Sequence, residues 1–321
     1  MNRRQVLQSG LSLMALNLVG LPKIASAAVP SVALQIPDEL MGNPLLDFSG
    51  LPKYTKISAA DVVPAMEFLI NQSKKTIDDI AAISPISWDR YYYSLLDIDD
   101  KLSKAWSAVA NLHSVRNDDA MRAAYGDAQK RLSDYSTWRG MHKGLYRQVL
   151  AIKNSAEFAT LDTPKQKAID DTLMDFRLSG IGLSDGDQQT LAKINSRLSE
   201  LSTQFSNHVL DATNGWHKTL DADALKGLNE SALASAKQKA AEKGETGYRI
   251  GLDTPSYLAV MNYADDGKLR QEMYEAFATR ASDVGPNAGK WNNNPVIAEI
   301  LKLRLQKAKL LGFDNYAEYS L

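Results

Sequence analysis

The sequence predicts a mainly α-helical protein that carries one small β-ribbon. Apolar residues recur at three- and four-residue intervals through most of the chain, which is the period of a helix that buries one face. Ser, Asp and Asn residues precede many of these stretches, and Pro or Gly separates them, as expected where helices begin and end. The pattern changes only near 246–263, where YRIGLD alternates like a strand.

The first 27 residues have the pattern of an export signal. Arg3 and Arg4 precede an apolar stretch at 11–21, and small residues at 25–27 (ASA) are typical of a cleavage site. The stretch is too short to span a bilayer, so we expect signal removal and no stable membrane anchor. We therefore expect export, to the periplasm, by the Sec or the twin-arginine route. If the signal is not functional, the protein is cytoplasmic.

The folded part is expected to begin near Asn43, because residues 28–42 contain two prolines and no sustained helical period and are typical of a linker. Ser58 and Asp61 have the spacing of a capping box, and Pro64 favours a fresh helical start near Ala65. Further apolar periods predict helices over residues 87–113, 118–145, 145–154, 163–178 and 184–212.

The C-terminal part combines the ribbon with more helices. Residues 248–253 are predicted as a strand, and 257–263 as a second extended piece or a short helix. Helices are then expected over 265–281 and 294–311, and another begins at Asp314. The apolar face of that last helix still needs a partner, so we expect the chain to be truncated.

Composition excludes several functions. The 37 basic and 38 acidic residues nearly cancel, so no nucleic-acid surface is expected. Cysteine is absent, which excludes disulfides and zinc–thiolate sites. No G-x-S-x-G elbow occurs, and GPNAGK at 285–290 has the wrong spacing for a phosphate loop and is better interpreted as a turn. The four histidines lack the spacing of a helical metal site: His113, His142, His208 and His217.

Five segments together resemble the oligopeptidase A branch of the thimet-oligopeptidase-like zinc metalloendopeptidases. The longest is FRLSGIGLSDGDQQTLAKINSRLSELSTQFSNHVLDATNGWHK at 176–218. The others are DTPSYLAVMNY at 253–263, LRQEMY at 269–274, RASDVGPNAGKW at 280–291 and LGFDNYAEYSL at 311–321. The resemblance covers about residues 43–321 and implies roughly the first half of the family's length.

The resemblance implies a two-lobed helical zincin peptidase with a deep channel. Residues 43–245 would form the helical N-terminal lobe that walls the channel, and 246–321 the ribbon and helices that begin the second lobe, truncated before the catalytic zinc domain. The family hydrolyses short peptides with a zinc-activated water, and the glutamate of its H-E-x-x-H motif is the general base. No H-E-x-x-H occurs here. We therefore assign no catalytic residue and no metal ligand, and we expect this chain to bind no zinc and to be inactive alone.

Two tyrosines are candidates for substrate contact. The resemblance places the ribbon near the substrate channel, where a strand edge could pair with a peptide backbone, and Tyr257 and Tyr263 lie beside it. Packing is the competing interpretation for both side chains. The alternative function is a stand-alone peptide-binding or assembly module, completed by a separately encoded C-terminal half.

Overall fold

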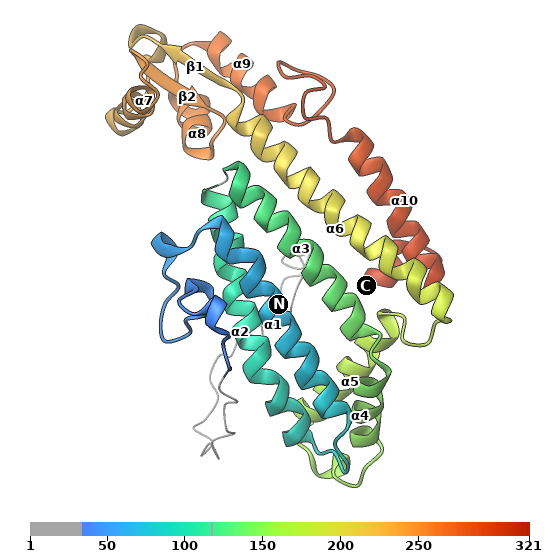
Figure 1. The fold of residues 1–321 in the computed structure, drawn as a ribbon. Helices are drawn as coiled ribbons and strands as arrows, with labels where there is room; N and C mark the ends of the chain where they lie inside the picture. Colours follow the sequence, from blue (N-terminus) through green and yellow to red (C-terminus); the bar gives the residue numbers. More distant parts are fainter. Residues whose placement is uncertain (1–33, 117) are drawn as a thin grey trace. The chain divides into compact units, whose positions relative to one another are not determined.

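The computed structural model describes residues 34–116 and 118–321, and the expected export signal and first part of the linker lie outside them. The chain divides into two compact units at Ala192 and Lys193, and helix α6 (Asp185–Asn214) runs across the division (Figure 1). Helices dominate both units, so the predicted mainly α class is confirmed. The lobe boundary expected at residue 245 refers to the larger family enzyme and stays a prediction.

The first unit is a helical bundle. Its main helices are α1 (Ala59–Ala81), α2 (Trp88–Val115), α3 (Asp119–Gly140), α4 (Lys143–Lys153) and α5 (Thr163–Leu178). Helix α1 packs against α2, α3 and α4, and its inward side chains, such as Met66, Leu69 and Ile77, are fully buried. Short 3₁₀ turns accompany them in the described residues of this unit: Asp38–Leu40, Pro44–Leu46, Tyr54–Lys56 and Phe158–Thr160.

Helix α1 begins earlier than the sequence suggested. The predicted capping box of Ser58 and Asp61 is present, and the helix continues from Ala59 through Pro64 without restarting at Ala65. Proline removes only one intrahelical hydrogen bond near the helix start. The buried face on either side of it, which includes Val62 and Met66, keeps the segment helical.

Other helix boundaries follow local capping. The helix predicted over 118–145 ends at Gly140, because His142 caps α4: its Nδ1 accepts a hydrogen bond from the Leu145 N–H at 2.9 Å. Asp162 caps α5, which begins at Thr163 as predicted, and accepts a bond from the Lys165 N–H at 3.0 Å.

The second unit contains a two-stranded ribbon and several helices. After α6 come β1 (His217–Leu220), a 3₁₀ turn (Asp223–Leu225), α7 (Glu230–Glu242), β2 (Tyr248–Gly251), α8 (Thr254–Tyr263), α9 (Gly267–Ala278), α10 (Asn294–Leu310) and α11 (Tyr316–Ser320). Helices α7 and α8 pack against β2, and α9 packs against α8 (Figure 1). Trp216, Ile250, Val260 and Met273 are among the buried residues of this second core.

The predicted ribbon is confirmed, with a different second strand. Strand β2 pairs antiparallel with β1, in the register His217 opposite Gly251 and Leu220 opposite Tyr248. The piece at 257–263 is part of helix α8, because Asp253 caps it and accepts a bond from the Ser256 N–H at 3.2 Å. No helix in the described part of the chain is long and apolar enough to cross a membrane.

Candidate functional site

Tyr257 takes part in a three-layer stack on the second unit. Its ring lies 3.9 Å from the ring of Phe277 on α9, centroid to centroid, with an angle of 18° between the planes. The guanidinium carbon of Arg280 lies 3.6 Å from the centroid of the same Phe277 ring. At these distances the Tyr257 ring and the Arg280 guanidinium must occupy opposite faces of the Phe277 ring. Tyr257 is therefore held by packing and presents only part of its surface to solvent.

Arg280 is fixed at the end of this stack. Its Nε donates to the Phe277 carbonyl oxygen at 3.0 Å, and its Nη1 donates to Thr213 Oγ1 at 3.1 Å. Burial lowers the pKa of Arg280, and the nearby Tyr257 phenol opposes that effect. A guanidinium ion that has lost water and stacks on aromatic rings is able to receive a carboxylate or a peptide carbonyl. Arg280, Phe277 and Thr213 could not be recognised as site residues from the sequence, because their contacts are tertiary.

Tyr263 lies apart from this stack. It is the last residue of α8 and is 53% exposed. It lies six positions after Tyr257, so the two side chains leave the helix on different faces. The structure thus places one candidate in a packed stack and the other on the open surface, and it does not bring them into one site.

Strand β1 presents a free edge near these helices. The sheet of the described chain has two strands, so only one edge of β1 is paired. The exposed side chains of His217 and Thr219 alternate with the half-buried Lys218 and Leu220. An unpaired strand edge offers backbone N–H and C=O groups to an extended peptide.

Charged pairs hold the ribbon to its surroundings. Lys218 Nζ lies 2.5 Å from Glu272 Oε2 on α9, and Glu245 accepts hydrogen bonds from Thr219 and Arg249. The bond from Thr219 lowers the pKa of Glu245, with Arg249 acting in the same direction. These contacts keep β1 and β2 in register.

The histidines do not form a zinc site. They lie in separate parts of the fold and have separate contacts. His113 stacks on Tyr125 at 3.8 Å, His142 caps α4 and contacts Asp78 at 3.1 Å, His208 donates to Asn293 Oδ1 at 2.9 Å, and His217 begins β1. In residues 34–116 and 118–321, no three His, Asp or Glu side chains gather as metal ligands would. These side chains therefore do not fit a catalytic zinc ion, and no step of hydrolysis is assigned to them.

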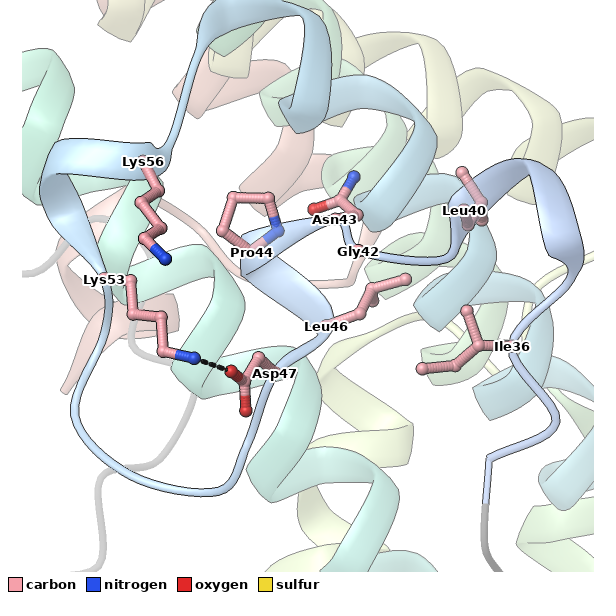
Figure 2. A pocket seen from close by; sticks show the side chains of 9 residues that line it. All are labelled: Ile36, Leu40, Gly42, Asn43, Pro44, Leu46, Asp47, Lys53 and Lys56. Carbon is pink, nitrogen blue, oxygen red and sulfur yellow. Dashed lines mark hydrogen bonds and ion pairs between the residues drawn. The ribbon is translucent and has the colours of Figure 1, made fainter.

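A separate pocket lies on the first unit, in the segment that precedes α1. The pocket has a volume of about 350 Å³. In Figure 2 the side chains of Ile36, Leu40 and Leu46 lie on one side of it and those of Lys53 and Lys56 on the other. Lys53 pairs with Asp47, and this bond, together with those from Ser49, holds the pKa of Asp47 far below its usual value. The pocket contains no residue that the sequence analysis selected.

Two family models match the chain. The model of the neurolysin/thimet oligopeptidase N-terminal domain covers residues 66–189, and the model of peptidase family M3 covers 260–321. Oligopeptidase A of Haemophilus influenzae is 51% identical over 88% of this chain and 41% of its own length. The chain belongs to the oligopeptidase A family. It spans about two fifths of the length of that relative.

Other oligopeptidase A relatives agree. The Escherichia coli protein is 48% identical over 88% of this chain and 42% of its own length. The probable cytosolic oligopeptidase A of Arabidopsis thaliana is 35% identical over 88% of this chain and 41% of its own length. Peptidase family M3 is zinc-dependent in general. Within this oligopeptidase A homologue, Tyr263, Phe277 and Arg280 fall inside the M3 match, and Tyr257 lies just before it.

Proposed function

We propose that this chain forms the channel-wall lobe of an oligopeptidase A-like metalloendopeptidase that hydrolyses short peptides. The observation that carries the proposal is the 51% identity to oligopeptidase A over 88% of the chain. In this role the chain binds and orients the peptide. The zinc ion supplies the water-activating chemistry in the family, and this chain contributes no ligand to it.

The peptide contacts of this lobe would lie on the second unit. The free edge of β1 would pair with an extended peptide backbone, because such an edge binds sequences of many kinds through main-chain hydrogen bonds. Tyr263 would contact substrate side chains from its exposed position, and Tyr257 would do so through the exposed part of its stack. Arg280 would receive a carboxylate or carbonyl oxygen.

Peptide binding and hydrolysis by the purified chain test this function. A fluorescent, internally quenched peptide is added with zinc and, separately, with a chelator. We expect an anisotropy increase that reports binding, and no cleavage that depends on zinc. Chelator-sensitive cleavage would show that the chain holds its own catalytic centre. A failure to bind any unstructured peptide would contradict the role of a peptide-binding lobe.

A second candidate function is a peptide-binding or assembly module that a separately encoded half completes. The apolar stripe on α10, formed by Ile297, Leu301 and Leu305, favours it, because these side chains are 41%, 59% and 49% exposed. The two functions differ in whether a separately encoded polypeptide completes the chain. Co-expression with a partner polypeptide separates them.

We also propose that the protein is exported to the periplasm and that its signal is removed after Ala27. The proposal rests on the basic start, the short apolar stretch and the small residues before the cleavage position. Mass determination of the protein from a periplasmic extract tests it. Full-length protein found in the cytoplasm would exclude cleavage.

A further inference from the structure

Helix α10 is poorly buried for its composition. It has 17 residues, and only Val296 and Ala308 among them are buried. Neither of the two hydrophobic cores of the described chain includes a residue of α10. A helix so rich in Ile and Leu normally has a partner on each apolar face.

The apolar residues of α10 form two opposite faces. Val296, Leu303 and Leu310 recur every seven residues on one face, and Val296 at its start is buried. Ile297, Leu301 and Leu305 recur every four residues on the other face and are exposed. We call this second group the α10 stripe. A helix that is apolar on opposite sides is typical of one covered from both sides.

Cationic side chains flank the α10 stripe. Helical geometry places Arg304 on one side of it and Lys302 and Lys309 on the other. Arg304 also lies over the Tyr316 ring at 5.0 Å, and Lys309 pairs with Asp314 at 3.1 Å, so Lys302 and Arg304 supply the flanking charge. Glu299, the acidic residue of this helix, is held mainly by Arg197 through two bonds of 2.7 and 2.9 Å, and Lys302 adds a weaker attraction. The flanks of the α10 stripe therefore keep an excess of positive charge. A partner therefore needs an apolar surface with acidic side chains at its margins.

We propose that the α10 stripe docks an amphipathic helix with acidic flanks, carried by the part of the oligopeptidase A length that this chain does not span. The inference rests on the proposed function. Its basis is the unpartnered apolar face, the cations beside it and the match of this segment to peptidase family M3 over 260–321. The chain covers 41% of the Haemophilus influenzae relative, so much of that family's length remains to supply such a helix.

A second copy of this chain is a poorer occupant. Two copies that met stripe to stripe would bring Lys302 and Arg304 of each against the same residues of the other. Like charges at the margin of an apolar contact oppose association and select against the wrong partner. Charge complementarity thus favours a different polypeptide.

The test co-expresses the full chain with a tagged polypeptide that contains the part of Haemophilus influenzae oligopeptidase A unmatched by this chain. We expect the two to co-purify. Leu301→Lys should weaken their association at least tenfold, because it places a charge in the centre of an apolar contact. Arg304→Glu should weaken it several-fold and more strongly at low salt. Leu258→Lys, at a residue 48% exposed on α8, is the control and should have no effect.

Three results would overturn the inference. The first is that the tagged polypeptide fails to co-purify with the unsubstituted chain. The second is that Leu301→Lys binds it as well as the control does; peptide binding by the chain alone then still supports the proposed function. The third is a dimer, seen by light scattering, that Leu301→Lys abolishes. The melting temperature of Leu301→Lys should stay within about 2 °C of the parent, since exposed positions affect stability little.

Discussion

Arg139 of α3 and Asp99 of α2 form a bidentate ion pair in the first unit. Nη1 lies 2.6 Å from Oδ1 and Nη2 lies 2.8 Å from Oδ2. Nη1 also donates to the Tyr135 hydroxyl at 3.2 Å, and that hydroxyl shares a 2.5 Å hydrogen bond with Ser73 of α1. Burial acts to lower the pKa of Arg139, but the bonds to Asp99 raise it above its ordinary value. One polar chain therefore connects three helices.

Asp99→Asn should destabilise the first unit by about 2 kcal/mol, because it leaves a half-buried guanidinium without its anion. The side chains of Arg139 and Asp99 are 26% and 32% exposed, so the effect lies between that of a surface pair and that of a fully buried one. Urea denaturation followed by circular dichroism measures it. Asp100→Asn is the control: its pair with Lys104 is at the surface, where about 0.5 kcal/mol or less is expected. Equal losses in the two variants would show that the pair contributes no more than a surface contact.

Asp253 has two roles that substitutions can separate. It caps α8, and Lys239 Nζ lies 2.9 Å from each of its carboxylate oxygens. Burial acts to raise the pKa of Asp253, but the bonds from Lys239 and Ser256 dominate and lower it. Asp253→Asn keeps a good capping group and loses the ion pair, so Asp253→Ala should be less stable than Asp253→Asn by about 1 kcal/mol.

The same residue predicts a pH effect. Its pKa is lower in the folded than in the unfolded protein, so its contribution is fully present above the unfolded value, about 3.9, and is lost as pH falls through the folded value. Stability should fall between about pH 5 and pH 3, and less steeply in Asp253→Asn. Melting temperatures over this range measure it. Parallel curves for the two proteins would contradict the assignment.

Helix starts were predictable where one short-range contact decides them. Ser58 and Ser184 each bond to a carboxylate three residues later, and Ser87 accepts from the Arg90 N–H at 3.4 Å. These bonds lie within one turn, so the sequence alone contains both partners. The fresh helical start predicted near Ala65 was wrong, because the tertiary burial of α1 outweighs the loss of one hydrogen bond at Pro64.

The ribbon and the stack were less predictable because their partners are distant in sequence. Strand β1 has four residues, and its partner β2 begins at Tyr248, 28 positions after β1 ends at Leu220. A strand this short has no clear alternation of its own. Tyr257 was selected as a candidate, but its contacts with Phe277 and Arg280 depend on how α8 packs against α9. Local pattern identifies such side chains and does not identify their neighbours.

Gly215 is required by close packing at the end of α6. A Cβ atom there would lie 2.2 Å from Cη2 of Trp291 and 2.9 Å from the Asp211 carbonyl oxygen. Gly215→Ala should therefore destabilise the second unit by about 1–3 kcal/mol. Adding Trp291→Leu should recover part of that loss, a non-additivity that thermal melts of both single variants and the double variant would reveal.

Gly126 provides the matched control for this substitution. It lies inside α3, and a Cβ atom there would have no neighbour within 4 Å. Gly126→Ala should stabilise the helix by up to about 1 kcal/mol, the opposite sign. If Gly215→Ala were also neutral or stabilising, the close approach of Trp291 would not exist in solution.

Tyr257 and Tyr263 should respond differently to substitution because one is packed and the other is open. Tyr263→Ala should change the melting temperature little, since the residue is 53% exposed, and it should weaken peptide binding if the ring contacts the peptide. Tyr257→Ala should lower stability by about 2 kcal/mol, because Phe277 loses a stacked partner. Tyr257→Phe keeps the stack and removes the hydroxyl, so weaker peptide binding at unchanged stability would assign the phenol to the substrate. Unchanged binding in Tyr263→Ala and Tyr257→Phe alike would leave both tyrosines as scaffold residues and place substrate contact elsewhere on the β1 edge.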